Sequence, residues 1–182
     1  MKICVVSDSH DRAEALAQAV REAKEQGAAA AIHCGDLIGA QSLKLAMAIG
    51  MPIHLVHGNN AGDPTALHNL VRTSEGLLTY HGPDARIELA GRRIFVVHYD
   101  HYGFAMACTG DWALVCCGHS HQAEARKVAN VRGEQTWLVN PGTVAGLAAP
   151  ATWALGDLAA MRFEVRELGG PFGRSLTAPM GA

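Results

Sequence analysis

The sequence predicts an α/β fold in which two mixed β-sheets form a sandwich flanked by helices. In the first half of the chain, short apolar runs alternate with segments of helical spacing, which is typical of a parallel sheet covered by helices. In the second half, strand-like runs follow one another between turn residues. The chain has 182 residues, 49% of them hydrophobic and 18% charged, which suits one compact domain.

Strands and helices alternate through the first 75 residues. The apolar runs at 2–6, 28–34 and 53–56 predict strands, and the segments 11–27, 41–50 and 64–75 predict helices. The apolar residues of the first helix form one stripe at spacings of three and four: Ala15, Leu16, Ala19, Val20 and Ala23. The β-α-β-α-β order implies that these three strands are parallel and covered by the helices.

The second half predicts mostly antiparallel strands. We expect a hairpin at 85–98 around Ala90-Gly91, a short helix near 103–108 and a buried strand at 112–117. Antiparallel strands joined by turns are expected at 124–140, 152–158 and 160–168. Residues 1–168 should therefore form a single domain. Residues 169–182 lack periodicity and are rich in Gly and Pro, which predicts a flexible C-terminal tail.

Composition excludes several classes of protein. Fifteen Lys and Arg against 17 Asp and Glu give a net charge of −2, so no broad cationic surface for a long nucleic acid is expected. No stretch reaches the roughly 18 apolar residues that span a bilayer, and no signal-peptide pattern is present. Five cysteines without a C-x-x-C pair predict buried free thiols. We therefore expect a cytoplasmic protein without membrane contact.

Five apolar runs each end in a polar cluster. The clusters are Ser7-Asp8-Ser9-His10, Gly35-Asp36, Gly58-Asn59-Asn60, His98-Tyr99-Asp100-His101 and Gly118-His119-Ser120-His121. Ligands of α/β sheets bind outside the carboxyl ends of the strands, so folding should bring these clusters together. Asp, His and Asn without thiolate suit Mn²⁺, Fe, Ni²⁺ or Zn²⁺. The sequence therefore predicts a metal site at the C-terminal ends of the strands.

Taken in order, the motifs D-x-H, G-D, G-N, H and G-H-x-H resemble the signature of the calcineurin-like metallophosphoesterases. The stretches SDSHD, IHCGD, VHGNN, VVH, CCGHSH and VNPGT are similar in particular to the small bacterial and archaeal phosphodiesterase branch of that family. The resemblance implies a dinuclear metal-dependent phosphoesterase, with a phosphodiesterase preferred over a monoesterase. It also implies that a hydroxide bridging the two metals attacks the phosphate ester directly.

The resemblance further implies which residues hold the metals. Seven residues match the family's ligands: Asp8, His10 and His121 for the first metal, Asn59, His98 and His119 for the second, and Asp36 as the bridge. Two divalent ions are therefore the expected cofactors. Manganese is the first choice, with nickel, iron or zinc as alternatives, because these ligands suit several ions.

The residues after the metal-binding asparagine depart from the family. Many members carry a histidine there, and the small branch often has cysteine followed by aspartate, whereas this chain has Asn60 and Ala61. An amide donates hydrogen bonds but is no general acid, so Asn60 is expected to bind substrate. His101, three residues past His98, is the candidate general acid, with a loop histidine at the rim of the site as the alternative. A weak acid favours diesters and esters with acidic leaving groups.

Several other polar residues have plainer assignments. His33 is expected either to support a metal ligand or to be a core histidine, and His54 and His57 are expected to be structural. The loop Asn140-Pro141-Gly142-Thr143 resembles one that the family places near the site.

Two other functions compete with phosphoester hydrolysis. A metallo-β-lactamase-type hydrolase needs H-x-H-x-D-H in one run, but His121 is followed by Gln122-Ala123-Glu124. The alternative function is a non-catalytic protein-interaction scaffold of the same fold, such as a retromer subunit. A scaffold should have lost metal ligands, whereas all seven are present here. The expected partner is a small phosphorylated substrate. A homodimer through the closing strands or the tail is also considered.

Overall fold

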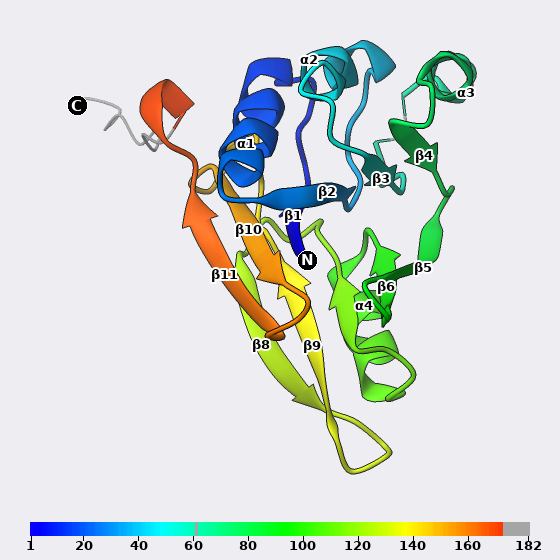
Figure 1. Cartoon of the computed structure of the whole chain (residues 1–182), viewed down its shortest axis with the longest axis vertical. Helices are drawn as coiled ribbons and strands as arrows, with labels where there is room; N and C mark the ends of the chain where they lie inside the picture. Colours follow the sequence, from blue (N-terminus) through cyan, green and yellow to red (C-terminus); the bar gives the residue numbers. More distant parts are fainter. Residues whose placement is uncertain (61, 173–182) are drawn as a thin grey trace, which may run out of the picture.

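The two predicted sheets are present and lie face to face (Figure 1). The computed structural model describes residues 1–60 and 62–172. The six-stranded sheet has the order β11 (Arg162–Glu167), β10 (Thr152–Asp157), β1 (Lys2–Val6), β2 (Ala28–His33), β3 (Ile53–Leu55) and β4 (Leu78–Tyr80). The five-stranded sheet has the order β5 (Asp84–Leu89), β6 (Arg92–Val97), β7 (Leu114–Cys116), β9 (Gln135–Asn140) and β8 (Glu124–Ala129). The predicted fold class is confirmed.

Helices cover the outer face of the six-stranded sheet (Figure 1). They are α1 (Ala13–Glu25), the short 3₁₀ helix η1 (Ala40–Ser42), α2 (Leu43–Met47) and α3 (Pro64–Thr73). The predicted stripe of α1 is buried, since Ala15, Leu16 and Val20 are at most 1% exposed. These side chains pack with the fully buried Trp153 of β10, whose Nε1 donates to Glu22 Oε2 at 3.2 Å. The amphipathic pattern therefore fixes which side of α1 faces the sheet.

A single helix, α4 (Asp100–Cys108), packs on the outer face of the five-stranded sheet within the described residues. The layer between the two sheets is apolar and contains Ile3, Ile32, Ile94 and Leu114, each fully buried. Cys116 joins this inner layer, whereas Cys117 belongs to the layer under α4. The two adjacent thiols therefore point to opposite faces, as expected for neighbours on an extended segment.

The structure corrects several details of the sequence prediction. β4 was not predicted, and the helix predicted at 41–50 is divided into η1 and the one-turn α2. The closing strands are not all antiparallel, because β9 pairs with β7 in parallel, although β8–β9 and β10–β11 are antiparallel. A strand that is buried on both faces carries no alternation from which its direction could be inferred.

The start of the predicted tail packs against the domain. The carbonyl oxygen of Gly169 accepts a hydrogen bond from Gln18 Nε2 at 2.6 Å, and a 3₁₀ helix, η2, spans Gly170–Phe172. The Phe172 side chain packs against the core beneath α1. The rest of the predicted tail, 173–182, lies outside the described residues. Among the described helices, none has the length and apolar character needed to cross a bilayer.

Strand direction sets the position of the polar clusters. β1, β2 and β3 run parallel in one sheet, and β6 and β7 run parallel in the other. His98 follows β6 and Gly118 follows β7. The Gly118 N–H donates a hydrogen bond to the His98 carbonyl oxygen at 2.8 Å, which joins the two strand ends. The carboxyl ends of all five strands therefore meet at one edge of the sandwich, where ligands of α/β sheets bind.

Candidate metal centre

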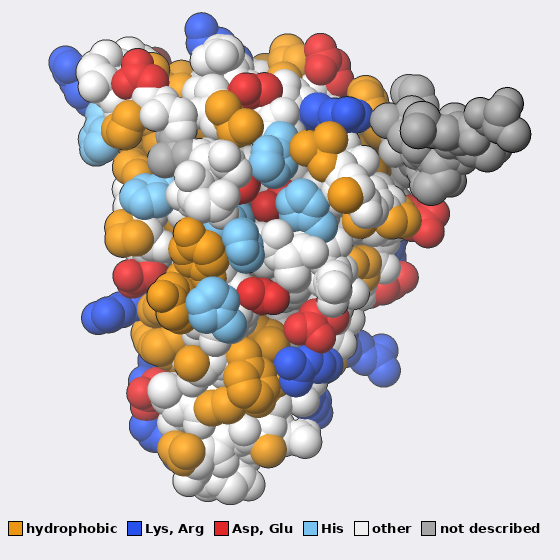
Figure 2. Space-filling view, turned by 180° about the vertical axis from the view of Figure 1, so that it is seen from behind, with side chains coloured by type: hydrophobic (Ala, Val, Ile, Leu, Met, Phe, Trp, Pro, Cys, Tyr) orange, Lys and Arg blue, Asp and Glu red, His pale blue; other side chains and the backbone are white. Residues whose placement is uncertain are grey.

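The seven predicted ligands gather where the five strands end. Asp8 and His10 follow β1, Asp36 follows β2 and Asn59 follows β3. His98 follows β6, and His119 and His121 follow β7. Figure 2 shows histidine side chains grouped around acidic side chains on one face of the molecule. The structure therefore brings residues separated by more than 100 positions in the sequence into one cluster.

One group of possible ligands is formed by Asp8, His10 and His121, whose ligand atoms lie within 4.8 Å of one another. His121 Nε2 is 3.3 Å from Asp8 Oδ1, and His10 Nε2 is 4.0 Å from the same oxygen. His10 Nε2 is also 3.6 Å from Asp36 Oδ2. The three side chains predicted for the first metal, together with the predicted bridge, therefore surround one point.

A second group lies beside the first and includes Asp8, Asp36 and His98. His98 Nε2 is 3.3 Å from Asp36 Oδ1 and 3.0 Å from Asn59 Oδ1. The ring of His119 packs edge-on against the His98 ring, with centroids 5.1 Å apart. His119 is also tied to the first group, because its backbone N–H donates to Asp8 Oδ2 at 3.1 Å.

Main-chain carbonyl groups orient two of the histidines. His98 Nδ1 is 2.9 Å from the Cys34 carbonyl oxygen, and His121 Nδ1 is 2.9 Å from the Leu147 carbonyl oxygen. A carbonyl oxygen only accepts, so Nδ1 carries a proton, and in the neutral form of the ring Nε2 presents a lone pair. A carbonyl that fixes the second nitrogen in this way is typical of metal-binding histidines.

Acceptor atoms consequently face one another across the centre. The lone pair of His98 Nε2 lies next to Asn59 Oδ1 and Asp36 Oδ1, and neither oxygen has a proton to donate. Among the described residues, Asp8 Oδ1 and His10 Nε2 are buried without a hydrogen-bond partner. Such atoms are costly to bury unless a cation or donor compensates them. The donor set therefore fits divalent metal ions.

The backbone at the site is held in an unusual conformation. Five of the seven residues have a positive φ: Asp8 (53°), His10 (40°), Asp36 (55°), His119 (69°) and His121 (58°). Left-handed backbone costs an L-residue about 1–2 kcal/mol, and such strain concentrates at functional sites. The folded protein therefore offsets this cost in order to aim these side chains inward.

Two glycines allow the ligands to approach one another closely. A Cβ at Gly58 would clash with Asp36 Oδ1 and lie 2.8 Å from His98 Nε2. A Cβ at Gly118 would clash with Ser7 Oγ and lie 2.7 Å from Asp8 Oδ2. A side chain at either position would therefore displace a carboxylate of the centre.

Asn60 contacts the predicted bridging carboxylate. Its backbone N–H donates to Asp36 Oδ1 at 2.9 Å, and its side-chain Nδ2 donates to Asp36 Oδ2 at 2.6 Å. Burial raises the pKa of Asp36, the two hydrogen bonds from Asn60 lower it, and the pKa is lowered overall. Asp36 is therefore ionised and oriented. Ala61, the other departure from the family, lies outside the described residues.

Residues around the centre hold its loops in place. The buried His33 accepts the Gly35 N–H on Nδ1 at 3.2 Å, and its Nε2 is 2.9 Å from Ser9 Oγ. Burial lowers the pKa of His33 to about 3, so the ring stays neutral. Thr143 Oγ1 donates to the Asp8 carbonyl oxygen at 2.9 Å, which brings the 140–143 loop to the site as predicted.

The remaining histidines of the first sheet form local structural contacts. His54 Nδ1 is 3.0 Å from His81 Nε2, and His57 Nδ1 contacts the Tyr80 hydroxyl. These pairs join the segment around β3 to β4 and its following loop. Both His54 and His57 therefore have the structural contacts that the sequence indicated.

His101 lies at the rim of the site. Its side chain is 63% exposed, and its Nδ1 is 3.5 Å from Asp100 Oδ1. Its ring packs on Tyr99 and Tyr102, with centroid distances of 5.6 and 4.3 Å. Tyr99 in turn packs on the His119 ring at 4.8 Å. The Tyr99 ring therefore separates His101 from the ligand cluster. Tyr99 was not singled out from the sequence, because an aromatic residue beside an apolar run is common in any protein core.

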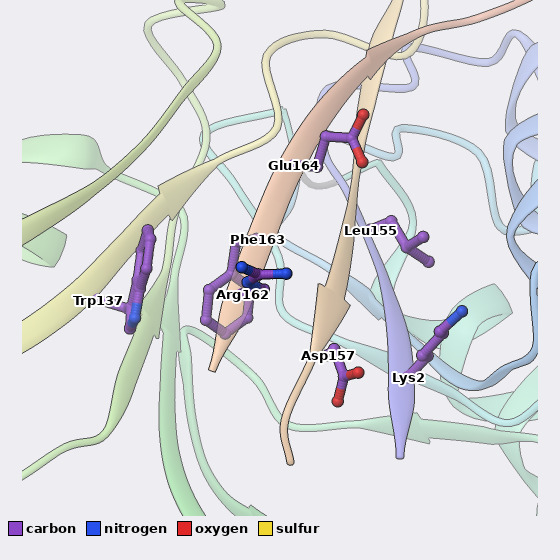
Figure 3. A pocket seen from close by; sticks show the side chains of 7 residues that line it. All are labelled: Lys2, Trp137, Leu155, Asp157, Arg162, Phe163 and Glu164. Atoms are coloured by element: carbon purple, nitrogen blue, oxygen red, sulfur yellow. The ribbon is translucent and has the colours of Figure 1, made fainter. Parts of the chain in front are cut away.

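A hollow of about 380 Å³ lies away from this centre (Figure 3). Its walls are the aromatic pair Trp137 and Phe163 with Leu155, and charged side chains surround them, including Lys2 and Asp157. Lys2 begins β1 whereas Asp8 follows its end, so the hollow lies at the opposite end of that strand from the metal ligands.

Comparison with known proteins agrees with this architecture. The model of the calcineurin-like phosphoesterase superfamily domain matches residues 1–161. Phosphodiesterase MJ0936 of Methanocaldococcus jannaschii is 25% identical over 150 residues, which cover 80% of this chain and 86% of that protein. The chain therefore belongs to the calcineurin-like phosphoesterase superfamily, as the ordered motifs implied.

Solved structures share the fold. A structure described as a novel archaeal phosphodiesterase superimposes with a TM-score of 0.82 at 22% identity, covering 92% of this chain and all of that one. The phosphoesterase YfcE of E. coli gives 0.61 at 17% identity, with 93% and 100% covered. Vps29 of Entamoeba histolytica gives 0.62 at 12% identity, with the same coverage. At these identities the likeness establishes the fold alone.

Proposed function

We propose that this phosphoesterase is a dinuclear metal-dependent phosphodiesterase that hydrolyses its substrate without a covalent intermediate. The observation that carries the proposal is the convergence of metal-ligand atoms at His98 Nε2, which lies 3.3 Å from Asp36 Oδ1 and 3.0 Å from Asn59 Oδ1. Mutually facing acceptors are stable when a cation lies between them. The phosphodiesterase name of the 25% identical relative supports the preference for diesters.

Each predicted ligand has a role in this proposal. Asp8, His10 and His121 would hold one ion, Asn59, His98 and His119 would hold the other, and Asp36 lies near ligands of both, beside His10 and His98. Two divalent ions held there would supply a hydroxide nucleophile and neutralise the phosphate oxygens. The chain contributes the orientation: the Cys34 and Leu147 carbonyls fix two histidine rings, and Asn60 fixes the Asp36 carboxylate.

The identity of the ions and of the partners is part of the proposal. Manganese is the first choice, and nickel, iron and zinc suit the same nitrogen and oxygen donors. We propose a small phosphorylated substrate because the relative is named a phosphodiesterase. The composition and the charge of −2 support a cytoplasmic location and no stable contact with a membrane or long nucleic acid. The homodimer considered from the sequence stays a prediction.

The residues expected to protonate the leaving group differ from the family pattern. Asn60 has no titratable proton and donates to Asp36, and the exposed His101 is separated from the ligands by Tyr99. Assistance from a general acid usually accelerates such reactions about 10²–10⁴-fold. We therefore propose that the enzyme favours esters whose leaving group departs without protonation, with His101 as the candidate acid and Asn60 as the candidate contact for substrate.

Hydrolysis by metal-stripped protein tests the proposal. Activity toward bis-p-nitrophenyl phosphate should be absent without metal, return with Mn²⁺ and exceed activity toward p-nitrophenyl phosphate. Methyl phenyl phosphate, whose leaving group is less acidic than that of methyl p-nitrophenyl phosphate, should react about 10²-fold more slowly or worse. Equal rates for the two methyl esters would argue against a missing general acid. A pH–rate profile that is unchanged in His101→Gln would show that His101 is not the general acid.

A non-catalytic protein-interaction scaffold is the second candidate function, and the structural likeness to Vps29 favours it. All seven ligand residues are present and converge, which a scaffold does not require. Metal binding without turnover of any of the four esters, with Mn²⁺, Ni²⁺, Zn²⁺ or Mg²⁺, would indicate an enzyme of narrow specificity. Absence of both metal binding and turnover would make the scaffold the better account.

A further inference from the structure

Aromatic rings form an exposed group next to the metal centre. We call Tyr99, His101 and Tyr102 the aromatic shelf. Their ring centroids lie 5.6 Å apart for Tyr99 and His101, 5.6 Å for Tyr99 and Tyr102, and 4.3 Å for His101 and Tyr102. The shelf reaches the site through Tyr99, whose ring contacts those of His119 at 4.8 Å and His98 at 5.4 Å.

The shelf faces solvent although its rings are large. The Tyr102 residue is 55% exposed and the His101 side chain 63%. Among the Phe, Tyr and Trp residues described, the exposed ones are Tyr102 and Phe104, and both belong to α4. Figure 2 shows apolar side chains on the same face as the histidine cluster and next to it. Exposed apolar groups beside a polar site are typical of a binding surface.

Packing of α4 does not account for this exposure. The residues that α4 buries are the small Gly103 and Ala107, and a Cβ at Gly103 would lie only 3.0 Å from the Cys117 Cβ. The helix therefore lies close to the sheet through its small residues and carries its large rings on the outer side. A surface helix normally buries its large apolar side chains, so core packing gives the two exposed rings no role.

From these observations we infer that the shelf binds a nucleobase, so that the substrate is a phosphodiester of a nucleoside. The inference rests on the proposed phosphodiesterase function. A phosphate held at the metal ligands leaves its sugar and base to extend over the neighbouring surface, where the shelf begins with Tyr99. Tyrosine and histidine rings stack on bases of any sequence, because every base has a π-face. The binding is therefore expected to tolerate different bases.

Two esters with the same leaving group separate base binding from chemistry. Thymidine 5′-(p-nitrophenyl phosphate) and ethyl p-nitrophenyl phosphate both release p-nitrophenolate, but only the first carries a base. In the Mn²⁺-loaded enzyme, kcat/KM should be higher for the thymidine ester. The Tyr102→Ala variant should reduce the ratio of the two kcat/KM values roughly tenfold or more, through KM of the thymidine ester, as expected when a stacked base is lost.

Matched variants distinguish stacking from a general loss of structure. Tyr102→Phe keeps the ring and should keep the ratio. Val131→Ala removes an apolar side chain that is 83% exposed in the β8–β9 turn and should also keep it. Binding of adenosine 5′-monophosphate, measured by calorimetry, should weaken by a similar factor in Tyr102→Ala, whereas binding of inorganic phosphate should not change.

The two proposals fail in different ways. If neither ester is hydrolysed with any metal and the protein binds no metal, the phosphodiesterase function is wrong. If the wild-type enzyme hydrolyses both esters and Tyr102→Ala leaves the ratio unchanged, the function stands and base binding at the shelf is wrong. Nucleotide binding no tighter than phosphate binding in the wild type would also overturn the inference.

Discussion

Replacing Asp36 by asparagine should abolish metal-dependent hydrolysis. Asp36 is 3% exposed and touches both groups of candidate ligands, at 3.6 Å from His10 Nε2 and 3.3 Å from His98 Nε2. An amide keeps the size of the carboxylate but removes its charge and offers only one acceptor oxygen. Because charge stabilisation by metal ions is worth several kcal/mol, a loss of at least about 10³-fold in kcat/KM is expected.

Asp63→Asn is the matched control for this variant. Asp63 is exposed and caps α3, with Oδ1 accepting the Thr65 N–H at 2.8 Å. Asparagine is as good a helix cap as aspartate, so the same chemical change should leave both fold and activity intact there. Circular dichroism of the two variants checks the fold. Activity of Asp36→Asn above about one tenth of the wild type would contradict the role of Asp36 as the bridge.

The Asn60→Ala variant should weaken metal binding about 10- to 100-fold, which is the usual effect of removing a residue that orients a metal ligand. Alanine keeps the backbone N–H bond to Asp36 Oδ1 but loses the 2.6 Å bond from Nδ2 to Oδ2. The carboxylate can then rotate away from the position that faces both groups. The affinity for Mn²⁺, measured by calorimetry on the metal-stripped protein, gives the effect directly.

The same variant tests whether Asn60 contacts substrate. At saturating Mn²⁺, a pure positioning role predicts recovery of most activity, whereas a substrate contact predicts a raised KM that metal does not correct. Asn69→Ala is the control, because Asn69 is an exposed residue of α3. Unchanged metal affinity in Asn60→Ala would show that the contact with Asp36 has no role in forming the centre.

The convergence of the ligands could be predicted from the sequence because two regularities act together. Apolar runs end in polar residues, and the carboxyl ends of parallel strands meet at one edge of a sheet. Asp8, Asp36 and His98 therefore cluster although 90 positions of sequence separate the first from the last. The apolar stripe of α1 predicted its buried side for a similar reason, because helical periodicity repeats in the sequence.

Contacts made by the main chain could not be predicted in this way. The Cys34 and Leu147 carbonyls orient two histidines, but every residue has a carbonyl group, so no residue type indicates them. The contact of Asn60 with Asp36 depends on the path of a loop, and an asparagine that binds substrate is indistinguishable in sequence from one that orients a carboxylate. β4 (LTY) lacks the longer apolar run that marked the equally short β7 in the sequence.

Titration of the metal-stripped protein with Mn²⁺ tests the dinuclear centre most directly. Calorimetry gives the number of ions bound for each chain, and hydrolysis of bis-p-nitrophenyl phosphate is followed at the same Mn²⁺ concentrations. The account predicts two ions per chain and activity that rises as the second ion binds. A single ion at full activity, or activity that needs no metal, would contradict it.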